Sequence, residues 1–188
     1  MGIAKAKETD MKTLKLFALA FLALVALLGM GGCNDTSSRA ILTVVSMNDG
    51  NVLYSDLVSD SGTVVADQAT VLFGNIQNDG GAPLEAGAPF SEIIVTGYTV
   101  TYDNGIYPPV SGGLTARVPS GGTAEVTIAM SDLGAKASVP TNIAVSTTAR
   151  ITFGGFVHTN GGNNGDGVSA IASLPVQVAN FKDDDIPE

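Results

Sequence analysis

Residues 145–178 read VSTTARITFGGFVHTNGGNNGDGVSAIASLPVQV, and apolar side chains alternate with polar ones along two parts of this stretch. One face carries Val145, Thr147, Ala149, Ile151 and Phe153 in the first part, and Val168, Ala170, Ala172, Leu174, Val176 and Val178 in the second. Side chains of a β-strand point alternately to its two faces, so the pattern predicts two half-buried strands. Gly154 and Gly155 interrupt the first strand, and we expect a β-bulge there that returns Phe156 to the core side.

Shorter segments nearer the N-terminus have the same pattern. It predicts strands over residues 40–47, 68–76, 91–102, 114–118 and 124–130, and short pieces at 53–58 and 63–66. In the 91–102 segment, Ile94, Tyr98, Val100 and Tyr102 share one parity. We therefore expect these four side chains to face the core.

Two turns are marked by their residue types. Asp103-Asn104-Gly105 is typical of a tight turn, because Asn and Gly accept the positive φ angles that such turns need. Pro119-Ser120-Gly121-Gly122 separates the strands predicted at 114–118 and 124–130. This four-residue turn predicts that the two strands form a hairpin.

The composition favours a protein built from strands. Gly, Thr, Ser, Val and Ala are abundant and Trp is absent, which is typical of short strands joined by small-residue turns. The predicted strands between residues 40 and 182 suffice for two sheets to bury their inner faces. We expect an all-β, immunoglobulin-like or fibronectin-like sandwich of about seven to eight antiparallel strands. A closed barrel is the alternative, and an acidic tail follows at 183–188.

The N-terminal part has the three-part design of a secretory signal. Lys12 and Lys15 precede an apolar stretch from Leu16 to Met30, which is followed by small residues and then Cys33. The apolar stretch is shorter than the roughly 20 residues that a membrane-spanning helix needs. We therefore expect residues 1–32 to be a helical, cleaved signal peptide, with Met11 as the true start of the chain, and an uncleaved membrane anchor is the alternative.

The end of this leader, Gly29-Met30-Gly31-Gly32-Cys33, resembles the lipobox of bacterial lipoproteins. Met30 departs from the pattern, since that family usually has Leu there. The resemblance implies cleavage between Gly32 and Cys33 and attachment of lipid to the Cys33 thiol. Asn34 in place of Asp implies, again by resemblance, the outer membrane as the destination. Residues 33–39 would then form the lipidated cysteine and a short polar tether.

Charge and cysteine content limit the partners and the means of stabilisation. Without the leader, the chain retains five basic and 16 acidic side chains, a net charge of −11. Such a domain repels phosphate backbones and anionic headgroups, so nucleic acid is not expected as a partner. Cys33 is the only cysteine, so the domain contains no internal disulfide and depends on burial of its core.

Calcium is the only metal for which the sequence offers candidate ligands. The loop 160–167 contains Asn160, Asn163, Asn164 and Asp166, whose oxygens suit a hard cation. The loop lacks the regular D-x-D-x-D-G spacing and a closing Glu, and Asn-Gly runs are common in ordinary turns. We expect no obligatory cofactor, with calcium at this loop as an alternative.

Other candidate sites are sparse. His158 is the only histidine, so a Ser-His-Asp triad would have to use it, yet no G-x-S-x-G elbow accompanies it. Four tyrosines could stack on sugars, although Tyr98 and Tyr102 share the predicted core face. No catalytic residue is therefore predicted.

The segments IIVTGYTVTYDNG and ARITFGGFVHTNGGNNGDGVSAIASLPVQVANF resemble the sandwich domains of small bacterial surface lipoproteins. That resemblance implies a fold and no chemistry. We expect a lipid-anchored, non-enzymatic protein of the cell envelope that is structural or binds a protein partner. The alternatives are a calcium- or glycan-binding module that uses loop 160–167 and a hydrolase built around His158.

Overall fold

The computed structural model describes residues 40–77, 92–158 and 164–181. The predicted signal peptide, the tether and the acidic tail lie outside these ranges. The elements in chain order are β1 (Ala40–Met47), the 3-10 turn η1 (Asn48–Gly50), β2 (Leu53–Asp56), β3 (Gln68–Gln77), β4 (Ile93–Tyr102), β5 (Val110–Val118), β6 (Thr123–Ala129), α2 (Leu133–Ala137), β7 (Ala144–His158) and β8 (Asn164–Ala179).

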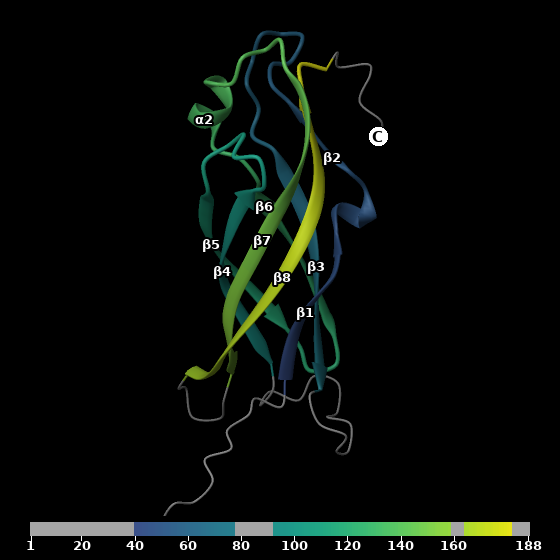
Figure 1. The fold of residues 1–188 in the computed structure, drawn as a ribbon. Coiled ribbons are helices and arrows are strands. Elements are labelled where there is room, and N and C mark those ends of the chain that lie inside the picture. The colour runs from purple at the N-terminus through teal and green to yellow at the C-terminus, as the bar shows by residue number, and fades with distance from the viewer. Residues whose placement is uncertain (1–39, 78–91, 159–163, 182–188) are drawn as a thin grey trace, which may run out of the picture. The chain divides into compact units, whose positions relative to one another are not determined.

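The described residues form an all-β domain of two sheets, as predicted. One sheet has the strand order β1-β3-β6 and the other the order β2-β8-β7-β4-β5 (Figure 1). The long strands β7 and β8 pair antiparallel along most of their length and form the centre of the larger sheet. The alternation in residues 145–178 therefore identifies two central strands of the larger sheet.

The prediction that all strands pair antiparallel is wrong for β2. Residues Leu53–Asp56 pair in parallel with Val176–Ala179 of β8. Parallel pairing requires a long connection between the partners, and most of the domain separates these two strands in sequence. The piece predicted at 63–66 is not a strand, because residues 63–67 carry no strand pairing.

The predicted hairpin between β5 and β6 is also wrong, because these strands belong to different sheets. Val118 at the end of β5 pairs with Ile93, whereas Thr123 at the start of β6 pairs with Gly74 of β3. The turn itself forms as expected, with the Gly122 N–H donating to the Pro119 carbonyl at 2.9 Å. The chain therefore crosses from one sheet to the other here, and both strands direct their apolar face to the same core.

The β-bulge lies in β4 rather than in β7. The pairing of β4 with both neighbours shifts register between Val95 and Gly97. Ile93 and Val95 are buried before the shift and Tyr98 after it, so Ile94 is only half-buried, contrary to prediction. An extra residue changes the face to which the following side chains point, which parity along the sequence does not reveal.

Strand β7 consequently keeps one parity through its two glycines. Phe153 and Val157 are buried, whereas Phe156 is half-exposed, so the prediction that Phe156 returns to the core is wrong. A Cβ atom on Gly155 would overlap the Ile94 carbonyl oxygen and lie 2.9 Å from Val95 Cα. Glycine is thus required where the bulge of β4 presses against β7.

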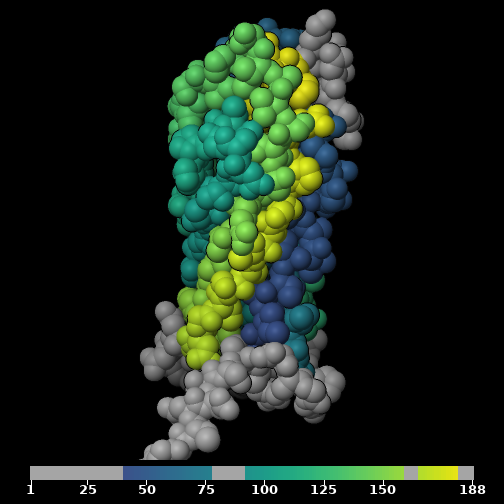
Figure 2. Space-filling model, in the orientation of Figure 1, coloured from purple at the N-terminus to yellow at the C-terminus, as the bar shows by residue number. Residues whose placement is uncertain are grey.

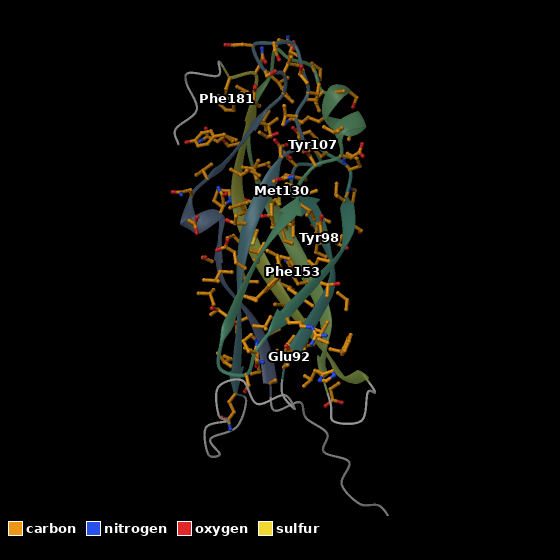
Figure 3. The ribbon with its side chains drawn as sticks, turned by 180° about the vertical axis from the view of Figure 1, so that it is seen from behind. Glu92, Tyr98, Tyr107, Met130, Phe153 and Phe181 are labelled. Atoms are coloured by element: carbon orange, nitrogen blue, oxygen red, sulfur yellow. The ribbon has the colours of Figure 1, made fainter. Side chains whose placement is uncertain are left out.

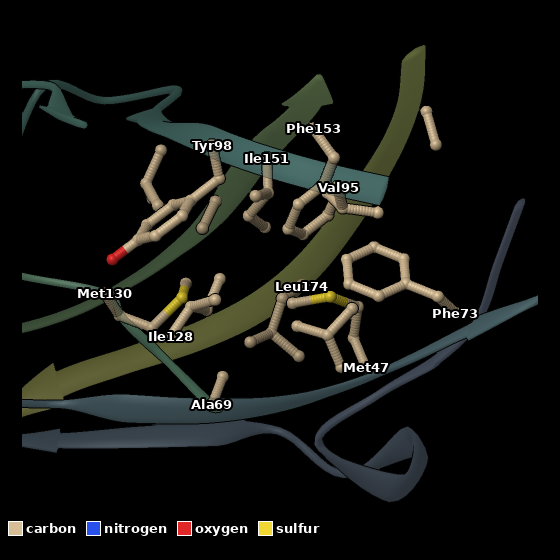
Figure 4. Packing of buried hydrophobic residues seen from close by; sticks show 14 of the residues in the cluster. Met47, Ala69, Phe73, Val95, Tyr98, Ile128, Met130, Ile151, Phe153 and Leu174 are labelled. Atoms are coloured by element: carbon tan, nitrogen blue, oxygen red, sulfur yellow. The ribbon is translucent and has the colours of Figure 1, made fainter. Parts of the chain in front are cut away.

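The core lies between the two sheets and joins them through aromatic side chains. Phe73 of β3 meets Phe153 of β7 edge to face, with ring centroids 4.9 Å apart and planes at 87° (Figure 4). Tyr98 and Tyr102 are buried, as predicted. The Tyr98 hydroxyl oxygen accepts from the Ala129 N–H at 3.1 Å. This side chain of the larger sheet is therefore hydrogen-bonded to the backbone of the smaller sheet.

Candidate functional site: a buried charged cluster and an open groove

A lysine and a carboxylate form an ion pair inside the domain. Lys136 Nζ lies 2.6 Å from Asp67 Oδ1, and the two side chains are 1% and 6% exposed. Asp67 directly precedes β3, whereas Lys136 lies in the short helix α2. This helix begins at Asp132, whose carboxylate accepts from the Ala135 N–H at 2.9 Å and so caps the first turn.

Two serine hydroxyls complete the surroundings of the Asp67 carboxylate. Ser55 Oγ of β2 and Ser131 Oγ, which lies just after β6, each donate to Asp67 Oδ2 at 2.7 Å. Lys136 Nζ also donates to the Val65 carbonyl oxygen at 2.8 Å. Burial of an ion pair is costly unless hydrogen bonds satisfy both groups, and these contacts supply that condition.

Two buried tyrosines close the cluster on its other side. Tyr107 Oη lies 2.8 Å from Ser55 Oγ, and because the Ser55 proton points to Asp67, Tyr107 is the donor. Tyr102 Oη donates to the Met130 carbonyl oxygen at 2.9 Å, and its ring packs on Tyr107 with centroids 5.2 Å apart. We call Ser55, Asp67, Tyr107, Ser131 and Lys136 the Asp67 cluster.

Both tyrosines keep their protons at neutral pH. Burial raises the pKa of Tyr107 to about 12; the hydrogen bond with Ser55 opposes this shift and the Asp67 charge adds to it. The pKa of Tyr102 is raised further, again mainly by burial and then by the charge of Asp67. The cluster is therefore an enclosed network whose hydroxyls all act as donors.

Little in the sequence indicates the Asp67 cluster. Its members come from β2, from the residue before β3, from the β4–β5 connection, from the end of β6 and from α2. Lys136 and Asp67 alone are 69 residues apart. The one local signal is that Lys136 is one of only two lysines after the leader, where acidic side chains outnumber basic ones, and this by itself indicates no partner.

A groove runs between the two sheets where each has an open strand edge. Strand β1 is the last strand of its sheet, and the part of β8 before Val176 has no strand partner on the side away from β7 among the described residues. Figure 2 shows yellow β8 beside the blue N-terminal strand, and a cavity of about 350 Å³ lies between them. Its lining comprises Val44, Val45, Ser46, Met47, Gly50, Asn51, Ile171, Ala172, Ser173, Leu174 and Pro175.

Two large apolar side chains of this groove are exposed to solvent. Val45 of β1 is 58% exposed and Ile171 of β8 is 55% exposed. Val45 lies at a register shift between β1 and β3, which falls between Val44 and Ser46. A strand from a partner protein can pair with an open strand edge and cover the exposed apolar side chains beside it.

The predicted cleavage and lipidation site and two of the four predicted calcium ligands lie outside the described residues. These are Gly32, Cys33, Asn160 and Asn163. Asn164 is the first residue of β8, and Asp166 lies two residues further along that strand, half-buried. Within 40–77, 92–158 and 164–181, no group of three or more His, Cys, Asp or Glu is placed to hold a metal ion. Calcium at loop 160–167 stays a prediction.

His158 and the Asp67 cluster belong to different ends of the domain. His158 ends β7, and its backbone N–H donates to the Glu92 carbonyl oxygen at 2.7 Å. Glu92 and Tyr107 lie toward opposite ends in Figure 3. The structure therefore does not bring His158 to the serine–carboxylate pairs of the Asp67 cluster.

The tyrosines offer little surface for stacking on sugar rings. Tyr98, Tyr102 and Tyr107 are buried. Tyr54 is half-buried and meets Phe181 edge to face at 5.6 Å. Stacking on a glycan needs an exposed ring face, and three of the four rings lack one.

Comparison with known proteins identifies no relative. No protein family model, no curated protein and no solved structure shows significant similarity to this chain. Across the described ranges, none of the helices combines the length and the apolar character needed to cross a bilayer. A function must therefore be inferred from the residues themselves.

Proposed function

We propose that this protein is a lipid-anchored, non-enzymatic component of the bacterial cell envelope, and that its immunoglobulin-like domain binds a protein partner. The groove between β1 and β8 is the observation that carries this proposal. It combines two open strand edges with exposed Val45 and Ile171. The charged side chains of the Asp67 cluster are enclosed and offer no access to a substrate.

The occupant that best fits this groove is an extended segment of another protein. An added strand satisfies the backbone groups of an open edge, and the exposed apolar side chains give it a surface to cover. The net charge of −11 without the leader disfavours a second copy of the chain and favours a neutral or basic segment. An added strand could pair with β8 only as far as Pro175, because proline has no N–H to donate.

The lipid anchor is the other half of the proposal, and it is supported by the residue pattern that ends at Cys33. Two or three fatty chains on one cysteine provide stable attachment to a membrane. Asn34 supports the outer membrane as the location. The domain would then be held a short distance from the bilayer by residues 33–39, where the groove remains available to a partner.

The binding proposal can be tested by capture from the envelope fraction of the producing cells. Val45→Asp and Ile171→Asp place a charge in the groove, whereas Ile76→Asp is a matched control. Ile76 is 51% exposed in a strand and does not line the groove. We expect the wild type and Ile76→Asp to retain the same partner, and each groove variant to lose it. Equal retention by all variants would place the binding surface elsewhere and refute the proposal.

A further inference from the structure

We propose that Lys136 and Asp67 join covalently, and that the Asp67 cluster promotes formation of an isopeptide bond between their side chains. The amine nitrogen already lies 2.6 Å from one carboxylate oxygen, with both groups shielded from water. Such proximity in a fixed geometry replaces an encounter between two groups in solution by a step within one molecule. This inference does not depend on the groove or on the lipid anchor.

The reaction begins with a proton transfer inside the ion pair. Transfer of one proton from Nζ to Oδ1, which lie 2.6 Å apart, gives a neutral amine and a neutral acid. Lys136 has almost no exposed surface, and Asp67 has little. The neutral amine is the nucleophile, and the neutral acid is the form that it can attack.

The reaction balances without any added reagent. Nζ bonds to Cγ of Asp67, and the electron pair of the carbonyl bond moves onto Oδ2. A second proton then passes from nitrogen to Oδ1, the Cγ–Oδ1 bond breaks, and Oδ1 leaves as water. The nitrogen keeps the third ammonium proton, so the product is a secondary amide and no atom changes its oxidation state.

The two serines lie where negative charge develops. Ser55 and Ser131 both donate to Oδ2 at 2.7 Å, and Oδ2 is the oxygen that carries the charge in the tetrahedral intermediate. Tyr107 supports Ser55 as a donor through its own hydroxyl. Fixed donors aimed at such an oxygen stabilise the transition state strongly in a site without water.

The surroundings also match the product. A secondary amide has one N–H to donate and one carbonyl oxygen that accepts two hydrogen bonds. The Val65 carbonyl oxygen, 2.8 Å from Nζ, accepts the remaining N–H, and the two serine hydroxyls serve the remaining oxygen. The atom that leaves, Oδ1, is the one that neither serine contacts. The bond would tie α2 to the start of β3 in a chain whose single cysteine permits no internal disulfide.

A tryptic digest of the folded full chain tests the proposal. Trypsin requires a positive charge on the side chain, so it does not cleave after a lysine whose amine has become an amide. We expect one branched product that joins peptide 40–117 to peptide 118–150, lighter by one water molecule than their sum. Separate peptides, with cleavage after Lys136 in a chain that circular dichroism shows to be folded, would overturn the proposal.

Three variants separate the cross-link from the ion pair. Lys136→Arg keeps the positive charge but removes the nucleophilic amine, and Asp67→Ala removes the electrophile, so neither should give the branched product. Ser131→Ala should slow its formation by about 100-fold or more in pulse-labelled cells, since one donor to Oδ2 is lost. A branched product in Lys136→Arg, or an unchanged rate in Ser131→Ala, would contradict the assigned roles.

Discussion

Ser55 shows how much one buried hydroxyl contributes in this protein. It is fully buried, donates to Asp67 and accepts from Tyr107, so two other polar groups depend on it. An alanine in its place leaves a carboxylate oxygen short of one donor and a phenol without its acceptor. Groups that are left unsatisfied in an interior cost more than the net gain from the original hydrogen bond.

We therefore expect Ser55→Ala to lower the free energy of unfolding by about 1–3 kcal/mol, as measured by urea denaturation. Ser111→Ala is the matched control, because Ser111 is exposed and its hydroxyl bonds to that of Thr99 at the solvent-exposed surface. Its effect should remain within about 0.5 kcal/mol. Equal effects of the two substitutions would show that the Asp67 cluster is not a tight network.

Tyr107 gives the domain a predictable response to alkaline pH. Its pKa rises from 10.0 to about 12 on folding, so the folded state holds the proton more tightly than the unfolded state. The stability that follows is complete below about pH 10 and is lost as the pH rises toward about 12. Tyr102 acts in the same direction, with a pKa that is also raised.

Urea unfolding at a series of pH values between about 9 and 12 would measure this response. We expect the free energy of unfolding to fall with pH across that window, and to fall less steeply in Tyr107→Phe, which has no proton to lose. A slope that is the same in Tyr107→Phe as in the wild type would contradict the assignment.

Among the elements, the bulge of β4 and the glycines of β7 form one unit. The register shift at Thr96 pushes the backbone of β4 toward Gly155, which leaves no room for a side chain there. A Cβ atom on neighbouring Gly154 would meet nothing within 4 Å. Two adjacent glycines therefore have different roles, although the sequence alone presents them as a pair.

Gly155→Ala should lower the free energy of unfolding by about 1–3 kcal/mol, because the backbone of β4 must move to admit the methyl group. Gly154→Ala provides the control, and we expect it to leave stability unchanged or slightly raised, since alanine restricts the unfolded chain more than glycine does. Thermal and urea denaturation of the two variants would measure the difference. Equal losses would mean that the bulge does not press on β7.

The predicted lipid anchor concerns the whole molecule, because it would determine the cellular location of the domain. Cys33 supplies the only thiol in the sequence to which lipid could be attached. In cells supplied with a labelled fatty acid, the wild-type chain should incorporate the label and sediment with membranes. Cys33→Ser should show no incorporation. Label that persists in Cys33→Ser, or a wild-type chain with an unmodified thiol and an intact leader, would refute the anchor.

Residue type and spacing are enough to place most of the strands and to identify which of their faces are buried. Strand β1 matches its predicted residues, and the apolar parities of β7 and β8 agree with their buried faces. This information is local, because alternation depends only on the two-residue period of an extended chain. The turn at Asp103-Asn104-Gly105 follows equally from its own residues, with Gly105 at a φ of 65°.

The tertiary structure alone decided which strands pair and which polar groups meet. The β5–β6 turn has the residues of a hairpin turn, yet its strands enter different sheets, and β2 pairs in parallel with a strand far along the chain. Asp67 and its three hydrogen-bond donors, Ser55, Ser131 and Lys136, come from four separate places in the sequence. Packing between distant segments selects these contacts, and no local period encodes them.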